Sequence, residues 1–524
     1  MPTARLVLDA AYAVAPVPQR LFGSFVEHLG RCVYTGIYEP DHPAADEDGL
    51  RTDVLALTRE IGPTVIRYPG GNFVSNYRWE DGIGPREQRP TRLDLAWHSI
   101  ETNQFGLHEF MTWAGKAGVE PMMAVNLGTR GLQEACDLIE YANHPGGTAL
   151  SDRRIANGAA DPFGVKLWCL GNEMDGPWQV GHKTAAEYGR LANETGKAMR
   201  LVDGDIELVA CGSSNSSMPT FGAWESEVLE HCYDTVDYIS LHAYYEEHGQ
   251  DEENRAYHEE TRDAALSFLA SAVDMDRFIE SVVATADAVR ARLGRQKRIN
   301  LSFDEWNVWY QRRFSGDGPQ PAGVAWRQQP RLIEDDYTVT DAVVVGTLLN
   351  SLLRHGDRVT IACQAQLVNV IGLLRSEPGA EAWKQTIAYP FEQVRRLARG
   401  QILQLVAKSD RYDCAAYTDV PIVDATATYD AESGRAALFV ANRSLADAAQ
   451  LEVDLRGIGG TSVVAATTLH AGEGQNRHTT NAVQHDAVVP TRFDDHAVRD
   501  GQLTATLPAL SWTVFELSAR REDR

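Results

Sequence analysis

The stretch "VKLWCLGNEMDGPW", from Val165 to Trp178, places an amide and a carboxylate directly after a short apolar run. Such a run is typical of a strand that is buried on both faces, and Gly171 marks the point where it ends. Asn172 and Glu173 follow at once. Because a buried carboxylate is costly unless it is paired, Glu173 is either a structural ion-pair partner or a working residue.

Similar short runs recur along the first 400 or so residues. Between them, apolar residues at three- and four-residue spacing predict helices over 52–62, 184–202 and 277–294, the last with Gly294 as its C-cap. Repeated strand–helix alternation predicts an α/β fold, a closed (β/α)8 TIM barrel. An open doubly wound sheet also alternates, but no G-x-G-x-x-G follows the first strand. The eight expected strands are 21–27, 64–70, 121–128, 165–173, 206–214, 236–245, 299–306 and 359–369.

The character of the chain changes after about residue 400. Short β-type runs such as "RAALFVANRS" (435–444) and "QLEVDLRGI" (450–458) alternate with Gly, Asp and Asn, and no helical pattern interrupts them. This pattern predicts a C-terminal antiparallel β-sandwich, jelly-roll-like in type. We therefore expect a catalytic barrel at 18–399 and a β-sandwich at 400–524. The alternating "ARLVLD" near the start predicts that residues 1–17 complete the sandwich.

Composition limits the class of partner. Among 524 residues, 73 acidic and 49 basic side chains give a net charge of −24, which argues against nucleic acid or an anionic membrane surface. No apolar stretch approaches the roughly 18–20 residues that span a bilayer. Asp9 interrupts the N-terminal apolar region, and the seven scattered Cys never form C-x-x-C, so we expect a cytoplasmic protein. No His/Cys cluster has metal-ligand spacing, so we expect neither metal nor cofactor.

Polar and aromatic residues gather at the expected strand ends, where barrels of this kind carry their function. Two carboxylates across a barrel mouth are the minimal machinery of glycoside hydrolysis, because one can protonate the leaving oxygen while the other attacks. Asn172 could donate to a sugar hydroxyl, and Trp97, Trp178, Trp306 and Trp309 offer faces to sugar C–H groups. The strand ends contribute Glu27, Arg67, Asn72, Asn172, Glu173, His242, Tyr244, Tyr245, Asp304, Glu305, Trp306, Gln364 and Gln366.

A purely structural role is an alternative explanation for several of these candidate residues and motifs. A single Glu at a strand end is more often an ion-pair or capping residue, although two such Glu at two strand ends favour catalysis. Asp304 competes with Glu305, because strand alternation predicts that only one of them faces the barrel centre. Trp97 and Trp178 are explained equally well as core. "YPGGNF" could be a tight turn in which the glycines supply positive φ.

Several long motifs resemble one known family. "RYPGGNFVSNYRWEDGIGP", "WCLGNEMDGPWQVGHKTAAEYGR", "LSFDEWNVWY" and "QAQLVNVI" are similar to those of the intracellular exo-acting α-L-arabinofuranosidases of glycoside hydrolase family 51, clan A, and the similarity runs almost from end to end. The resemblance implies a retaining enzyme that releases terminal non-reducing α-L-arabinofuranosyl residues from arabinan and arabinoxylan oligosaccharides. It also implies a homo-oligomer, of hexamer type.

The same resemblance implies residue roles. Glu173 corresponds to the family's acid/base and Glu305 to its nucleophile. The implied substrate contacts are Glu27, Arg67, Asn72, Asn172, Tyr244 and Gln366, with Trp97 and Trp309 as walls of the pocket. The acidic segment after Tyr245 and the segment after Tyr310 are longer than the pattern leads us to expect, which bears on aglycone preference and on the oligomer interface.

Three other functions remain open from the residues. A β-xylosidase or endo-β-glucanase of the same clan shares the paired Glu, and an endo-acting enzyme would need an open groove. A non-catalytic sugar-binding protein would not need both carboxylates. A metal-dependent barrel hydrolase would need a ligand cluster and would lose activity with a chelator.

Overall fold

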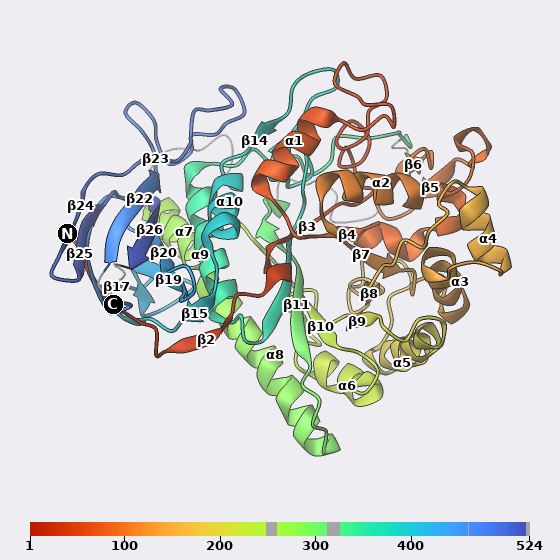
Figure 1. Cartoon of the computed structure of the whole chain (residues 1–524), viewed down its shortest axis with the longest axis horizontal. Coiled ribbons are helices and arrows are strands. Elements are labelled where there is room, and N and C mark those ends of the chain that lie inside the picture. Colours follow the sequence, from red (N-terminus) through yellow and green to blue (C-terminus); the bar gives the residue numbers. More distant parts are fainter. Residues whose placement is uncertain (248–258, 312–324, 460, 520–524) are drawn as a thin grey trace.

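The computed structural model describes residues 1–247, 259–311, 325–459 and 461–519. Figure 1 shows a barrel beside two β-sheets, with helices α9 and α10 between them. Most of the acidic segment after Tyr245 and half of the segment after Tyr310 lie outside the described residues. Among the described residues, no helix is long and apolar enough to cross a membrane.

All eight predicted barrel strands are confirmed. They close into one parallel sheet in the order β10-β11-β12-β3-β4-β7-β8-β9. Several strands stop a few residues before the end of the predicted range. Glu27 and Glu173 therefore stand just past their strands, on the loops of the barrel mouth. The strands are β3 (Gly23–Phe25), β4 (Val65–Tyr68), β7 (Glu120–Val125), β8 (Leu167–Leu170), β9 (Glu207–Ala210), β10 (Tyr238–Tyr245), β11 (Asn300–Val308) and β12 (Val359–Gln364).

Helices surround the barrel, and the three predicted ones correspond to α1, α5 and α8. Gly294 ends α8 with φ of 66° and donates its N–H to the carbonyls of Arg290 and Ala291, so the predicted C-cap is confirmed. The helices are α1 (Thr52–Ile61), α2 (Leu107–Ala117), α3 (Leu132–Asn143), α4 (Ala149–Ala156), α5 (Ala185–Val202), α6 (Ala223–Cys232), α7 (Glu259–Leu269), α8 (Ser271–Leu293), α9 (Val339–Arg354) and α10 (Ala388–Leu397).

Short elements decorate the loops of the barrel. The hairpin β5–β6 and the 3-10 turn η2 follow β4 and line the mouth, whereas η1 leads into β3. These elements are η1 (Gln19–Phe22), η2 (Asn72–Asn76), η3 (Trp79–Gly82), η4 (Arg86–Gln88), β5 (Arg92–Asp94), β6 (Ser99–Glu101), β13 (Leu374–Arg375) and β14 (Trp383–Lys384).

Two sheets form the other layer, in the orders β16-β1-β21-β25-β24 and β2-β15-β19-β20-β26-β22-β23. Their pairs are antiparallel except that β1 runs parallel to β21. The N-terminal β1 and β2 thus join strands from the end of the chain. The strands, with a small β17–β18 hairpin, are β1 (Thr3–Asp9), β2 (Ala13–Pro16), β15 (Gln401–Leu403), β16 (Val406–Ser409), β17 (Arg411–Tyr412), β18 (Val420–Pro421), β19 (Val423–Asp430), β20 (Arg435–Asn442), β21 (Ala449–Gly457), β22 (Thr461–Leu469), β23 (Thr491–Arg492), β24 (His496–Arg499), β25 (Gln502–Leu507) and β26 (Ser511–Ala519).

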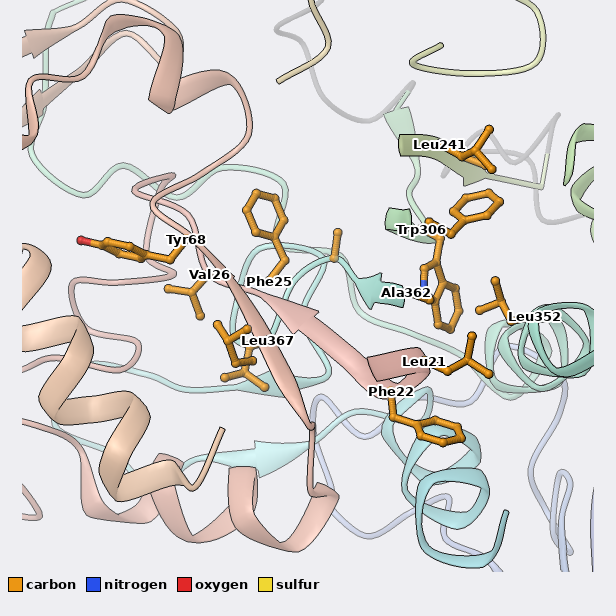
Figure 2. Packing of buried hydrophobic residues seen from close by; sticks show 14 of the residues in the cluster. Leu21, Phe22, Phe25, Val26, Tyr68, Leu241, Trp306, Leu352, Ala362 and Leu367 are labelled. Atoms are coloured by element: carbon orange, nitrogen blue, oxygen red, sulfur yellow. The ribbon is translucent and has the colours of Figure 1, made fainter. Parts of the chain in front are cut away.

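Helix α9 joins the two layers. Every residue from Val339 to Leu353 is buried. A Cβ on Gly346 would lie 2.3 Å from Cε3 of Trp512, so only glycine lets α9 approach β26 this closely. On the barrel side, Figure 2 shows Trp306 beside Leu352 of α9. Trp306 is fully buried there, so the expectation that it offers a face to sugar is wrong.

Candidate active site

A β-bulge turns two consecutive carboxylates into the barrel. Phe303 points outward, against Phe278 of α8, and Trp306 points outward toward α9. Between them the register of β11 against β12 shifts, so Asp304 and Glu305 both point inward. The expectation that only one of the two faces the centre is therefore wrong, because it assumed unbroken strand alternation.

Glu305 is held from both sides by donors. Arg67 Nη1 donates to its Oε1 over 2.6 Å, and the Tyr244 hydroxyl donates to its Oε2 over 2.7 Å. Arg67 also donates to Asn172 Oδ1 at 2.7 Å and is itself buried. Despite burial, the neighbouring Asp304 and Glu305 raise the pKa of Arg67 well above its usual value. This cation is permanent, so Glu305 is held from both sides by donors anchored in the barrel, as a positioned nucleophile requires.

Glu173 has a different environment. It stands past β8 with φ of 43°, a left-handed conformation that costs energy in a residue other than glycine. His242 Nδ1 lies 2.8 Å from its Oε1, and Trp178 Nε1 donates to its Oε2 at 2.7 Å. Burial is the main cause of a raised pKa for Glu173, and the nearby charge of Glu305 adds to it. A raised pKa is what a carboxyl needs to act as a general acid near neutral pH.

His242 connects the two carboxylates to the barrel interior. Its Nε2 lies 2.8 Å from Asp304 Oδ1, and its Nδ1 lies 3.6 Å from Glu305 Oε2. Burial alone would lower the pKa of His242, but Glu305, Asp304 and Glu173 raise it to about 10. Burial would likewise raise the pKa of Asp304, but Arg67 and His242 bring it below its usual value. At neutral pH, His242 is thus an imidazolium that donates from both ring nitrogens.

The two Glu carboxyls are close together. One oxygen of Glu173 and one of Glu305 lie within 4.8 Å of each other. Retaining glycosidases hold their carboxyls about 5–5.5 Å apart, whereas inverting enzymes need about 6.5–9.5 Å to admit a water. The spacing therefore fits double displacement.

A third carboxyl, that of Glu27, lines the same pocket. Its Oε1 accepts from the Phe73 backbone N–H at 2.9 Å and from Trp97 Nε1 at 3.0 Å, and its Oε2 accepts from Gln366 Nε2 at 3.1 Å. In the part of the chain that the structure describes, no cation donates a hydrogen bond to Glu27, and burial raises its pKa to about 8, with Glu305 adding to the shift.

The glycines of "YPGGNF" bring the backbone between two of these carboxyls. A Cβ on Gly71 would lie 3.1 Å from Glu27 Oε2 and 3.2 Å from Glu305 Oε1. Neither glycine has a positive φ, so the expectation that they supply positive φ to a turn is wrong. The absence of a side chain matters because it leaves space for the carboxyls.

Known proteins match this chain along almost its whole length. Family models described as the alpha-L-arabinofuranosidase 1 domain and the alpha-L-arabinofuranosidase C-terminal domain match residues 57–263 and 304–511. The chain is 49% identical to an intracellular exo-alpha-(1->5)-L-arabinofuranosidase of Bacillus subtilis, over 99% of each. It is 56% identical to such an enzyme of Streptomyces lividans, over 98% of this chain and 75% of the relative. The chain belongs to the family 51 α-L-arabinofuranosidases.

A solved structure agrees with this assignment. The family 51 enzyme AbfB of Bifidobacterium longum superposes with a TM-score of 0.92 at 48% identity, over 98% of this chain and 99% of that one. This α-L-arabinofuranosidase therefore has the barrel and β-sheets of its family, and the resemblance read from the motifs is confirmed.

All ten predicted site residues of this arabinofuranosidase lie at one mouth. Asn172 Nδ2 donates to Asn72 Oδ1 at 3.2 Å, and the rings of Tyr244 and Trp309 meet edge to face at 5.1 Å. The ten are Glu27, Arg67, Asn72, Trp97, Asn172, Glu173, Tyr244, Glu305, Trp309 and Gln366. Trp178 is not core, because 47% of it is exposed.

Sequence reasoning missed the role of His242 as a bridge. The residue stood at a predicted strand end without a function, and a register shift between Ser240 and His242 turns it toward Glu173. No periodicity in the sequence predicts that register shift. One ligand atom each of Glu173, His242 and Glu305 lie within 4.8 Å of one another, close enough to surround an ion. Both ring nitrogens of His242 are already within hydrogen-bond distance of carboxylates, those of Glu173 and Asp304.

A cavity of about 880 Å³ adjoins the catalytic pocket. Tyr244 and Trp309 form its inner wall, and Tyr417 reaches it from the loop between β17 and β18. That loop is fixed to α7, because Ala415 N–H donates to the Asp263 carboxylate at 3.1 Å. Aromatic faces beside carboxylates are a surface that suits a neutral sugar.

Proposed function

We propose that this chain removes terminal non-reducing α-L-arabinofuranosyl residues from arabinose-containing oligosaccharides with retention of configuration. The observation that carries the proposal is the pair of close carboxyls in opposite environments. Glu305 receives hydrogen bonds from a permanent cation and a phenol, and Glu173 has a raised pKa. The relatives are named as exo-acting on (1->5) or (1->6) linkages.

The reaction proceeds in two displacements. Glu305 attacks the anomeric carbon while the Glu173 proton passes to the departing glycosidic oxygen, so that a covalent arabinosyl–enzyme and a free alcohol form. Glu173, now a carboxylate, then takes a proton from water, and the hydroxide oxygen displaces Glu305 from the same face that the leaving group vacated. Both carboxyls return to their initial states.

The remaining pocket residues bind the sugar. The carboxyl group of Glu27 and the amide groups of Asn72, Asn172 and Gln366 are assigned to its hydroxyls. Arg67 and Tyr244 position Glu305. Trp97 and Trp309 are the walls. The adjoining cavity provides room for the rest of the oligosaccharide, which favours an oligosaccharide substrate over arabinose-sized glycosides alone.

Other features of the proposal concern the whole chain. The relatives named intracellular support an intracellular location. We propose residues 18–399 as the catalytic unit and 400–524 with 1–17 as the sandwich, because β2 pairs with β15. A homo-oligomer of hexamer type rests on the family resemblance, and light scattering of the purified protein tests it.

Hydrolysis of 4-nitrophenyl α-L-arabinofuranoside by the wild-type protein and by Glu305→Ala tests the function. We expect fast wild-type cleavage, collapse in the variant and rescue by azide, which replaces the missing nucleophile. Asp304→Asn is the matched control, since it removes the adjacent carboxylate and azide should not rescue it. The β-D-xylopyranoside, assayed alongside, should be a poor substrate. Absence of arabinofuranosidase activity, or a faster xyloside, would overturn the proposal.

A further inference from the structure

The loop after β8 folds an exposed tryptophan back onto Glu173. Nearly half of Trp178 is exposed, yet its indole N–H donates to Glu173 Oε2 at 2.7 Å. Gly176 makes this possible, because a Cβ there would lie 2.5 Å from Cε2 and 2.9 Å from Nε1 of the indole. The Gly176 N–H also donates to the Glu173 carbonyl at 2.9 Å. The loop is therefore built so that the indole reaches the carboxyl.

This contact favours one protonation state of Glu173. An indole nitrogen is a donor and never an acceptor. His242, as an imidazolium, donates to the other oxygen, so both oxygens of Glu173 accept N–H bonds. A proton on Oε2 would have to point away from the indole N–H, and the oxygen that carries it is a weaker acceptor than a carboxylate oxygen. The bound position of Trp178 therefore favours the carboxylate form of Glu173 over the acid form.

We propose that Trp178 is a displaceable positioning residue: its indole occupies Glu173 Oε2 in the free enzyme, and the departing glycosidic oxygen takes that place in the substrate complex. The inference rests on the proposed acid/base role of Glu173. The exposure of Trp178 allows it to move without disturbing the core. Its indole face, once released, lies at the mouth where the leaving sugar sits.

The consequence is a dependence on pH that differs between the free enzyme and the complex. The indole N–H stabilises the carboxylate and so lowers the pKa of Glu173 relative to a site without it. Loss of the contact should raise that pKa in the free enzyme only. The charged groups beside Glu173 are His242 from β10 and Glu305 from β11. Arg67 from β4 contacts Glu305 and Asp304 from β11 contacts His242, while Asp175 on the loop of Glu173 is bound to Ser214.

Trp178→Phe tests this, because it keeps an aromatic ring and removes the N–H. The alkaline limb of kcat/KM reports the free enzyme, and that of kcat reports the complex. With an arabino-oligosaccharide as substrate, we expect the limb of kcat/KM to move up by about half to one pH unit, as for loss of a hydrogen bond to a charge at a partly exposed site. The limb of kcat should stay in place.

Gly176→Ala should remove the contact between Trp178 and Glu173 in a second and independent way. Trp178 remains, but the new Cβ pushes the indole off Glu173. The φ of Gly176 is not positive, so alanine is compatible with the backbone. We expect the same shift as in Trp178→Phe and no further shift in the double variant. Leu201→Ala, which trims an exposed apolar side chain near the end of α5, is the control and should move neither limb.

The outcomes separate the inference from the proposed function. If neither single variant moves the kcat/KM limb, or if kcat and kcat/KM move together, the positioning role is wrong. If Glu173→Ala retains wild-type activity and its alkaline limb, the acid/base assignment itself fails. If Glu173→Ala loses activity and the alkaline limb, as an acid/base requires, while Trp178→Phe and Gly176→Ala leave the limbs unmoved, the inference alone is overturned.

Discussion

The β11 side and the β8 side of the pocket hold their carboxyls in contrasting ways. On the β11 side, Glu305 lies between Arg67 and Tyr244, both anchored within the barrel. On the β8 side, Glu173 lies between buried His242 and half-exposed Trp178. A nucleophile keeps one charge state until it reacts, whereas an acid/base must change its charge state twice in each turnover. Each carboxyl has two donor partners. The nucleophile differs from the acid/base because both of its partners are anchored, whereas one partner of the acid/base is half-exposed.

Glu173→Ala should have the largest effect on activity and tests the β8 side of the pocket. Without the acid, we expect kcat/KM for an oligosaccharide to fall by roughly 10²–10⁴-fold, because its leaving group needs protonation. The loss for 4-nitrophenyl α-L-arabinofuranoside should be much smaller, since nitrophenolate leaves unaided. Equal losses for both substrates, measured by steady-state kinetics, would contradict the role on the β8 side.

Tyr244→Phe sharpens the β11 side. It removes the hydroxyl that donates to Glu305 Oε2 and leaves Arg67 in place. We expect kcat to fall by about 10–100-fold, the usual range for one hydrogen bond to a charged group. Tyr245→Phe is the matched control, because that hydroxyl donates to Asp274 instead. A control as damaged as Tyr244→Phe would mean that the effect is structural.

Glu27 is a third carboxyl for this comparison, and among the described residues no cation donates a hydrogen bond to it. Its pKa is raised to about 8 in the folded protein, from about 4.5 when unfolded. The raised pKa therefore contributes its full share to the free energy of unfolding below pH 4.5. That share, on the order of a few kcal/mol, is lost as the pH rises through 8. Urea unfolding at pH 5, 7 and 9 checks this. The stability of the wild type relative to Glu27→Gln should decline across that range, and a constant difference would refute it.

Tyr417 should have the smallest effect, because it lies outside both sides of the pocket. Tyr417→Ala removes an aromatic face of the adjoining cavity, so KM for an arabino-oligosaccharide should rise about three- to tenfold. Tyr417→Phe keeps the ring and should behave like wild type. The 4-nitrophenyl substrate, whose leaving group is a single ring, should be affected less than the oligosaccharide by Tyr417→Ala.

Much of the fold could be read from the chain because its local signals agree with one another. Glu27, Glu173 and Gln366, which stand just past β3, β8 and β12, are marked in the sequence by apolar runs that stop at polar residues. Alternation in "ARLVLD" also indicated that the N-terminus adds a strand, and β1 does pair with β16 and β21. The parallel direction of β1 was not visible, because strand direction depends on which distant partner is reached.

The site was less visible wherever the backbone departs from regular geometry. The bulge at Asp304 and Glu305 and the shift before His242 change which way side chains point, and no residue pattern marks them. The contact between Trp178 and Glu173 depends on the space that Gly176 leaves. A composition-based reading could only weigh that tryptophan equally between core and pocket.

The stereochemistry of azide rescue tests the division of roles most directly. Proton NMR of the products from Glu305→Ala and Glu173→Ala, each with 4-nitrophenyl α-L-arabinofuranoside and azide, distinguishes the two anomers. Without Glu305, azide attacks the free substrate from the opposite face and should give the β-azide. Without Glu173, azide attacks the arabinosyl–enzyme and should give the α-azide. Products of one configuration from both variants, or the reverse assignment, would contradict the account.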